Sequence, residues 1–359
     1  MFLEALEERR LFSVFDKDVI RLEKGKVYQL NDTLYLRSNQ KIIGDDKYPP
    51  ILQLKEKGKS VIVIRPNTTN VQIDGIRLNG YKNQPAIRVS GNTHVFSHIS
   101  ATRTTGSVFI VENAEGVTIK DCNQTNITQR GFLYANRTWN LIVRNVATCG
   151  NVYENEMRFH RYNGLAIINC RIDANNPMAI KSGVVHKANA LRVHDGKRAW
   201  ISGLTVSGNV YFGVMDKDNG GLSDLKRGKI AEFKRKMSLT SEVIAENINI
   251  YGNLELGTNL KFKINNIGMI SWDRGTAITI HPNYGPFKNG FGLVRKQAQG
   301  EINGAWIKYT NAPVKPMNLS STIKYFNRGV EINNDGDFIS WFNGEIKMQT
   351  VVFNKQVLK

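Results

Sequence analysis

One short pattern, apolar residues at alternate positions followed by a polar turn residue, recurs along the chain and constrains its fold more than any other feature. It is written VQIDGI at 71–76, HVFSHI at 94–99, VTIKDC at 117–122, LIVRNV at 141–146 and LAIINC at 165–170. The turn position is therefore occupied by Gly75, His98, Asp121, Asn145 and Asn169, with steps of 23, 23, 24 and 24 residues. A period in the low twenties with strand-like alternation is typical of a solenoid.

The residue types in this repeat favour β-structure. Leucine-rich repeats share the period, but their repeated leucine framework is missing, and β-branched residues dominate instead. Asn, Gly and Asp at one turn position predict a backbone bend in the left-handed region, where these residues are tolerated best. Less regular copies continue at 199–204, 243–248 and 262–267. We therefore expect an all-β, right-handed parallel β-helix, with each coil stacking ~4.8 Å on the last.

The repeat also gives each cysteine a place. Cys122 and Cys170 fall in the apolar column that follows the turn, and Cys149 lies between them in the sequence. The three spacings match no zinc site and no disulfide framework. The pattern predicts that all three are thiols of the core.

The domain organisation expected from the sequence is a single domain. Residues 1–18 form an N-terminal cap, 19–290 the β-helix, and 291–359 the C-terminal coils or cap. The start, MFLEALEERRLF, predicts a short amphipathic helix that covers the open end of the solenoid. The step grows to 34 residues after Asn169 and to 44 after Gly203, which predicts loop insertions at 173–189 and 216–237. No apolar run is long enough for a membrane helix, and no secretory signal is seen.

With the opening stretch VIRLEKGKVYQLNDTLYLRSNQKIIGDD at 19–46, the chain resembles the pectate-lyase-like superfamily of parallel β-helices, which includes phage tailspike-type proteins. The resemblance covers roughly 19–290 and implies the fold. It also implies that loops at the position of the first insertion wall a groove over the first strand of each coil. It does not decide the reaction, because the superfamily includes lyases, hydrolases, epimerases and non-catalytic adhesins.

The first strand of each coil presents an unusual outer face between about residues 130 and 200. In RFH at 158–160, the apolar Phe159 is expected to point inward, which leaves Arg158 and His160 outside. RVH at 192–194 repeats the pattern 34 residues later, so Arg192 should stack on Arg158 and His194 on His160. The same reasoning places Tyr134, Asn136, Glu112 and Glu156 on this face.

The charge balance indicates what this face would bind. The chain has 49 Lys and Arg against 31 Asp and Glu, a net charge of +18, which favours a polyanion. Two arginines on adjacent strands repel each other unless an anion lies near them. Glu154, Glu156 and Asp195 could supply that anion in part. The functional alternative is a substrate carboxylate held by the forked guanidinium donors. Nucleic acid is disfavoured, because few aromatic residues are interleaved with the basic ones.

These residues favour β-elimination on an acidic, uronic-acid-containing polysaccharide. Arg158 and Arg192 would neutralise the substrate carboxylate, and the base would be His160, His194 or a lysine of the first insertion, Lys181 or Lys187. Tyr134 would protonate the leaving oxygen. The residues expected to bind substrate around them are Asn136, Glu156, Arg161, Lys187, Lys197 and Glu112.

Several alternatives stay open at this point. Hydrolysis needs two carboxyl groups ~5–9.5 Å apart, and no paired-aspartate cluster is seen. A C5-epimerase uses nearly the same proton abstraction as a lyase. A non-catalytic carbohydrate-binding protein or virion spike, in which a trimer would be expected, could carry the same face. Calcium would need clustered carboxylates, so we expect metal-independent chemistry and no cofactor. The expected setting is extracellular or virion-associated, with no membrane partner.

Overall fold

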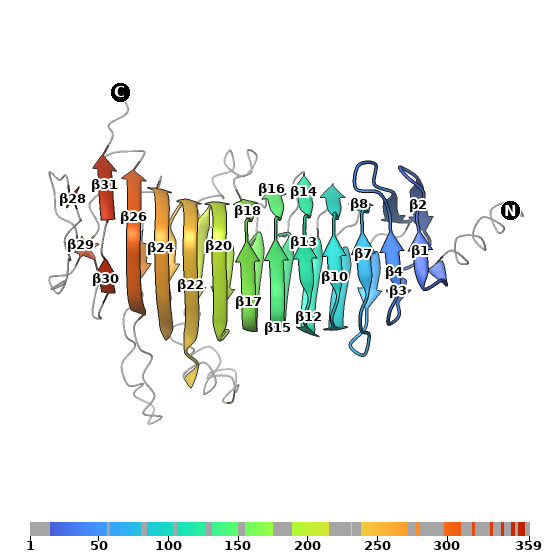
Figure 1. The fold of residues 1–359 in the computed structure, drawn as a ribbon, viewed down its shortest axis with the longest axis horizontal. Coiled ribbons are helices and arrows are strands. Elements are labelled where there is room, and N and C mark those ends of the chain that lie inside the picture. Colours follow the sequence, from blue (N-terminus) through green and yellow to red (C-terminus); the bar gives the residue numbers. More distant parts are fainter. Residues whose placement is uncertain are drawn as a thin grey trace, which may run out of the picture.

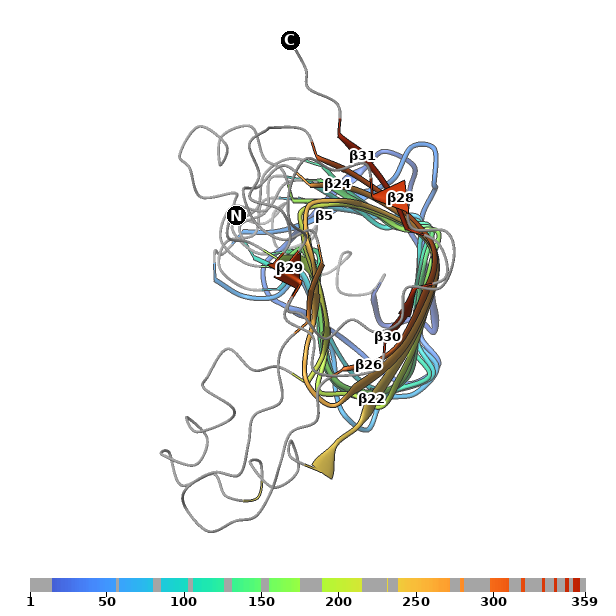
Figure 2. The ribbon, with the colours of Figure 1, turned by 90° about the vertical axis from the view of Figure 1, so that its left-hand side faces the viewer.

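The computed structural model describes residues 15–55, 58–79, 85–102, 106–125, 131–149, 155–174, 189–214, 231, 238–271, 278–280 and 298–309, and short strands beyond. Strands from successive coils pair in parallel, as in the β15–β17 and β20–β22 registers. They stack along one long axis with the N-terminal coils at the right of Figure 1. Viewed along that axis, the coils superimpose as a closed tube (Figure 2). The protein is a parallel β-helix, as the repeat predicts.

Each coil contributes to three parallel sheets. They are called first, second and third in the order in which the chain passes through them after the first insertion. The first sheet contains β3 (Leu34–Leu36), β6 (Ile62–Ile64), β9 (Ile87–Asn92), β12 (Phe109–Glu115), β19 (Asn189–His194), β21 (Asn209–Gly213), β23 (Leu254–Leu256) and β25 (Ile278–Ile280). The second contains β1 (Val19–Arg21), β4 (Lys41–Ile43), β7 (Gln72–Asp74), β10 (Val95–Ser97) and β13 (Thr118–Lys120). This second sheet faces the viewer in Figure 1.

The third sheet and the long strands complete the coils. The third sheet contains β2 (Val27–Leu30), β5 (Ile51–Leu54), β8 (Arg77–Asn79), β11 (Ser100–Thr102), β14 (Asn123–Thr125), β16 (Ala147–Cys149) and β18 (Arg171–Asp173). Two long strands bend from the first sheet into the second: β15 (Leu133–Arg144) and β17 (Met157–Ile168). Four others bend from the second into the third: β20 (Arg198–Ser207), β22 (Ser241–Tyr251), β24 (Leu260–Ser271) and β26 (Gln299–Tyr309).

Strands nearer the C-terminus extend the stack. β30 (Ile346–Met348) and β31 (Val351–Lys355) pair with β26, and β28 (Glu331–Ile332) pairs with β31. β27 (Asn318–Leu319) and β29 (Ile339–Ser340) form a separate two-stranded sheet. No helix among the described residues has the length and apolar character needed to cross a membrane.

The predicted turn column is confirmed by the backbone. Every member has a positive φ, from 49° at His98 to 67° at Gly75, including Asn145 at 52°. The left-handed region costs most residues roughly 1–2 kcal/mol, which explains the preference for Asn, Asp and Gly there. The side chains also bond along the column, because the Asn145 amide donates to the Asp121 carboxylate over 2.8 Å.

The interior is filled by the apolar columns that the repeat predicts. Cys122 and Cys170 are each 2% exposed, and burial raises the pKa of the Cys122 thiol to about 12 and that of Cys170 to about 11. The prediction that all three cysteines are core thiols is wrong for Cys149, which is exposed. Cys149 ends its short strand directly after the inward-facing Thr148, so it points to the outside.

Two sequence predictions fall largely outside the described residues. The N-terminal helix was expected in a segment of which only the last residues, from Phe15 onward, are described. The two insertions are bracketed by described strands: the first lies between β18 and β19, and the second between β21 and β22. The described strands on either side place the first insertion between the third and first sheets and the second between the first and second sheets.

Candidate functional site

The site begins with the strand register, which confirms the predicted stacking. Arg192 pairs with Arg158, and His194 with His160, across the β17–β19 ladder. One coil earlier, Tyr134 pairs with Arg158 and Asn136 with His160 across β15–β17. These six residues therefore lie on one face of the first sheet, spread over three adjacent coils.

The two imidazoles share one carboxylate. Their rings stack with centroids 4.7 Å apart and planes inclined by 16°. Asp195 Oδ2 lies 3.2 Å from His160 Nε2 and also 3.2 Å from His194 Nδ1. Since an ionised carboxylate only accepts hydrogen bonds, each imidazole carries its proton on the nitrogen that faces Asp195.

Arg158 completes the assignment of protons. Its Nε donates to His194 Nε2 over 3.0 Å, so that nitrogen is an acceptor and the His194 proton lies on Nδ1. Its guanidinium carbon also lies 5.6 Å from the centroid of the Tyr134 ring, within cation–π range. One chain of contacts therefore runs Tyr134, Arg158, His194, Asp195, His160. It leaves His160 Nδ1 as the basic nitrogen of the His160 ring.

Burial and charge hold both imidazoles neutral near pH 7. Burial lowers the pKa of His194 to about 4, although Asp195 opposes the shift. Burial also lowers the pKa of His160, again against Asp195, and the positive Arg161 and Arg158 add to the effect. Burial alone would raise the pKa of Asp195, but the hydrogen bonds from the two histidines outweigh it, and its pKa lies well below the usual value. The cluster is a carboxylate between two neutral rings.

A local bend in the backbone brings Asp195 to this position. Asp195 follows His194 directly and has a φ of 56°, in the left-handed region. Gly196 comes next because a Cβ there would lie 2.4 Å from atoms of the buried Tyr162 ring. A non-glycine residue held at positive φ costs of order 1–3 kcal/mol and is found often at functional sites.

Access to the cluster differs between its members. The His194 side chain is 1% exposed and that of Asp195 2%, whereas that of His160 is 16% exposed. Arg158, Arg192 and Tyr134 are partly exposed. Burial, and to a lesser degree the charge of Arg158, lowers the pKa of Arg192. A ligand would therefore meet His160 and Arg158, while His194 and Asp195 support them from below.

The remaining predicted residues lie at varied distances from this centre. Glu112, one coil beyond Asn136 in the same column, forms an ion pair with Arg88 over 3.4 Å. Asn136 has a buried Oδ1 atom without a hydrogen-bond partner. Arg161 is partly exposed at the bend, and Lys197 is exposed past it, its backbone N–H bonded to the Tyr162 carbonyl. Lys181 and Lys187 lie outside the described residues, so their roles stay predictions.

The expectation that Glu156 lies on the outer face is wrong. Its side chain is fully buried, and neither carboxylate oxygen has a hydrogen-bond partner of ordinary geometry. Burial raises its pKa to about 8, while the nearby Thr148 hydroxyl and Phe132 backbone lower it less. The alternation of in and out breaks at this corner, where Glu156 and the next residue, Met157, are both buried. Glu156 therefore cannot touch a ligand on the first sheet.

Asp195 is a residue of the candidate site for which the sequence suggests a different role. The sequence suggests Asp195 as a counter-ion for the arginines, whereas its carboxylate contacts the two histidines. The signal was present in the sequence: RVHD places a carboxylate directly after the outward histidine at the end of its strand. Only the bend at Asp195 turns that carboxylate back under both rings.

The same three residues are the set most suited to a metal. Within the described part of the chain, His160, His194 and Asp195 form the one group of three donors whose ligand atoms all lie within 4.8 Å of one another. A metal at His194 Nδ1 would require the proton to move to Nε2, which faces the Arg158 N–H donor. Metal-bound histidines usually donate their other N–H to an acceptor. The hydrogen-bond network therefore fits an acid–base cluster better than a metal site.

Comparison with known proteins supports the fold. No family model matches the sequence, and no curated protein matches it. A structure titled Geobacillus virus E2 ORF18 matches 81% of this chain at 10% identity with a TM-score of 0.54. The catalytic domain of a GH87 alpha-1,3-glucanase in complex with tetrasaccharides matches 97% at 11% identity and a TM-score of 0.52. The chain spans 53% and 66% of the length of these two proteins. At such identities the similarity shows a shared fold and nothing finer.

Proposed function

We propose that this chain is a carbohydrate-active enzyme that cleaves an acidic polysaccharide by β-elimination on the first sheet. The observation that carries the proposal is the contact chain from Tyr134 through Arg158, His194 and Asp195 to His160. It combines a cation, a neutral base and a phenol on one face, which are the groups that elimination from a uronate requires. The glucanase title among the structural matches names a polysaccharide-acting enzyme, which supports a polysaccharide as the substrate.

In the proposed mechanism, the guanidinium of Arg158 first binds the substrate carboxylate. The bond from Arg158 to His194 uses only Nε, so its terminal Nη1 and Nη2 groups are the part that a substrate carboxylate would meet. A bidentate guanidinium–carboxylate pair fixes the sugar and withdraws charge from C5. Arg161 adds a second cation beside His160, since its charge lowers the pKa of that imidazole.

The proton transfers follow from the protonation states. His160 Nδ1 takes the proton from C5, and the electron pair of the C5–H bond forms the C4=C5 double bond as the C4–O bond breaks. Tyr134 donates a proton to the departing oxygen. Asp195 holds the His160 proton on Nε2 and stabilises the imidazolium that forms. A positioned acid or base of this kind contributes roughly 10²–10⁴-fold to a rate.

Hydrolysis fits Asp195, Glu156 and Glu112 less well. Asp195 is buried and accepts from two histidines, Glu156 is enclosed in the core, and Glu112 is paired with Arg88. None of the three is free to act as an exposed acid or base opposite a second carboxyl, which is what inverting and retaining hydrolysis both need.

Product analysis on a panel of uronic-acid polymers tests the proposal. Elimination gives a rising ultraviolet absorbance from the C4=C5 double bond together with new reducing ends. New reducing ends without that absorbance would mean hydrolysis. A changed uronate composition without cleavage would mean epimerisation, and binding without any reaction would mean a non-catalytic receptor-binding protein. Any of these three results overturns β-elimination.

A further inference from the structure

A second surface of the molecule, on the second sheet, exposes apolar side chains in a continuous column. Ile142 pairs with Ala166, Ala166 with Trp200, and Trp200 with Ile244, so these residues are neighbours on four successive coils. Their exposed fractions are 39% for Ile142, 43% for Trp200 and 41% for Ile244. We call this column the Trp200 platform.

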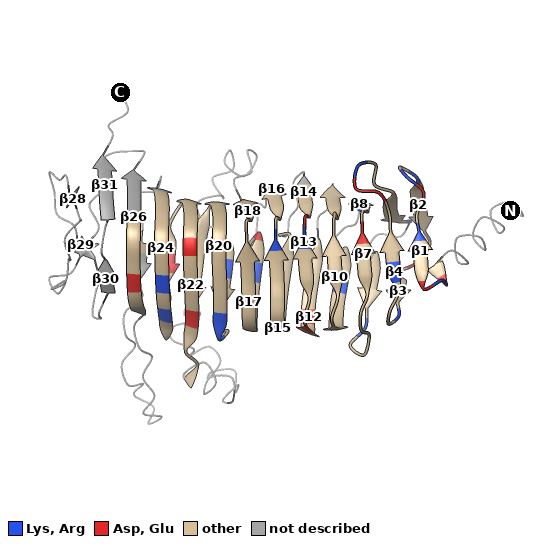
Figure 3. Ribbon diagram, in the orientation of Figure 1, with Lys and Arg blue, Asp and Glu red and all other residues tan. Residues whose placement is uncertain are grey.

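The platform is nearly free of charge in a strongly basic chain. Figure 3 shows β15, β17 and β20 mostly uncharged on the face toward the viewer, apart from basic bands on β15 and β20, while β22 and β26 carry acidic bands and β24 carries basic ones. Beyond Ile244 the same column continues with Lys263, which pairs with Glu301 over 3.5 Å. An acidic ligand would gain little on the uncharged part, so the platform suits a neutral ligand.

The size of the platform decides between a protein partner and a smaller ligand. Its exposed apolar area is on the order of 300 Å², the size of the largest apolar patch on an ordinary monomer. A stable protein interface buries about 800 Å² on each partner. The opposite charges Arg198 and Glu242, paired in register, border the platform and add no apolar area. The platform is therefore too small to form the core of a dimer interface.

We propose that the Trp200 platform binds neutral pyranose units of a polysaccharide, at a site separate from the proposed cleavage site. A pyranose ring presents C–H groups on its faces and hydroxyl groups around its rim. An indole flanked by small and branched aliphatic side chains gives the flat apolar contact that the ring faces need. Ala166 beside Trp200 leaves room next to the indole. The column spans three strand spacings, about 14 Å, which accommodates a short oligosaccharide.

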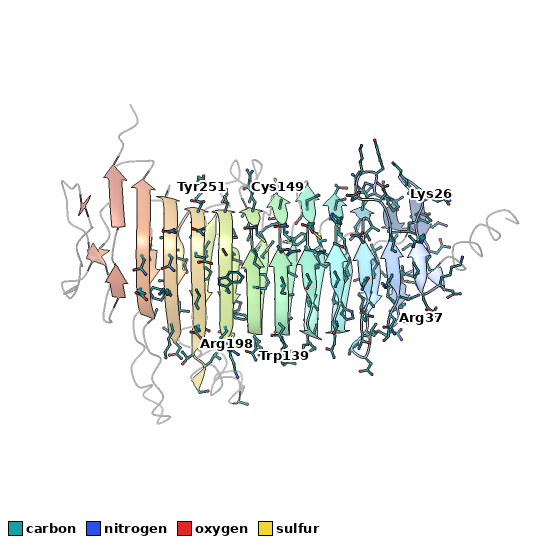
Figure 4. All side chains as sticks on the ribbon, in the orientation of Figure 1. Lys26, Arg37, Trp139, Cys149, Arg198 and Tyr251 are labelled. Atoms are coloured by element: carbon teal, nitrogen blue, oxygen red, sulfur yellow. The ribbon has the colours of Figure 1, made fainter. Side chains whose placement is uncertain are left out.

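Trp139 provides a matched control on the same molecule. It is also 43% exposed, but its neighbours along the ladder are the polar Glu115 and Asn163. Figure 4 shows Trp139 at the lower edge of the coils, near the level of Arg198. Trp139→Ala therefore removes an indole that is as exposed as that of Trp200 and leaves the residues of the platform unchanged.

The test is calorimetric titration of the full chain with three neutral hexasaccharides, of β-1,4-glucose, β-1,3-glucose and β-1,4-mannose, and with a hexagalacturonate. We expect at least one neutral hexasaccharide to bind, and Trp200→Ala to weaken it about tenfold while Trp139→Ala leaves it within about twofold. Trp200→Tyr should retain most of the affinity, and Ala166→Gln, which fills the space beside an intact indole, should reduce it.

Each contrary result overturns the proposal. If none of the three neutral hexasaccharides binds, the proposed ligand class is wrong. If Trp200→Ala and Trp139→Ala weaken binding equally, the platform is not the binding site. Circular dichroism of each variant identifies loss of binding that comes from unfolding, in which case Ala166→Gln decides. Because the platform lies on the second sheet and the proposed cleavage site on the first, a failure of neutral sugar binding can be distinguished from a failure of uronate cleavage.

Discussion

Replacing the buried carboxyl of Glu156 by an amide should remove a large part of the pH dependence of stability. Its pKa is raised from 4.5 to about 8 in the folded protein, so the folded state keeps a proton that the unfolded chain loses between those values. The stabilisation is fully present below pH 4.5 and is lost as pH rises through 8. A difference of 3.5 units at 1.36 kcal/mol per unit amounts to about 5 kcal/mol.

Comparison of the wild type with Glu156→Gln from pH 6.5 to 8 isolates this effect, because His194, whose pKa is lowered from 6.5 to about 4, contributes equally to both proteins. Over these 1.5 units the wild-type protein should lose about 2 kcal/mol of its free energy of unfolding. Glu156→Gln should lose little, since glutamine has the shape of the protonated acid and never ionises. Urea unfolding followed by circular dichroism at several pH values measures the difference.

An exposed carboxyl on the first sheet supplies the control. Glu115→Gln, at the end of β12, should keep the wild-type slope between pH 6.5 and 8. Identical slopes for the wild type and Glu156→Gln would show that Glu156 does not hold a proton in the folded state. The assignment of Glu156 as a neutral core residue would then be wrong.

Three further predictions concern the acid limb, the turn column and the proposed mechanism. In the Glu156→Gln background, the free energy of unfolding should fall by up to about 3 kcal/mol as pH drops from 6.5 to 4. His194 gains a proton in the unfolded chain over this range, whereas the folded ring, with a pKa of about 4, stays largely neutral; a urea midpoint that does not change with pH would contradict this prediction. Asn145→Val should cost about 2 kcal/mol and Asn145→Gly much less, since φ is 52° there and valine also loses the bond to Asp121; equal melting temperatures would refute the strain argument. Asp195→Asn should lower kcat about 100-fold with little change in KM, as measured by initial rates on the best uronate polymer, whereas a change confined to KM would place Asp195 in binding instead.

The fold and the strand register could be predicted because both follow from local chemistry repeated at a fixed period. The turn residue must tolerate a positive φ, and the alternating apolar residues must face inward, so one coil predicts the next. The pairing of Arg158 with Arg192 and of His160 with His194 follows from the same period once the insertion between the coils is allowed for.

The parts of the site that could not be predicted depend on departures from that period. At the corner before the first strand, two consecutive residues face the interior, as Phe132 and Leu133 do one coil before Glu156 and Met157. Strand alternation therefore placed Glu156 on the wrong side. The bend at Asp195 turns a carboxylate beneath two rings of adjacent coils, and no pattern within a single coil contains that three-body contact. Burial of His194 likewise depends on its surroundings and not on its strand position.

The most direct test of the proposed site is the initial rate of ultraviolet absorbance increase on the uronate polymer that the wild type cleaves best. His160→Ala should lower this rate by roughly 10²–10⁴-fold. His98→Ala, a histidine of the turn column that bonds to Asp74 on the second sheet, should leave it nearly unchanged. A His160→Ala variant that folds and retains the wild-type rate would contradict the assignment of His160 as the base.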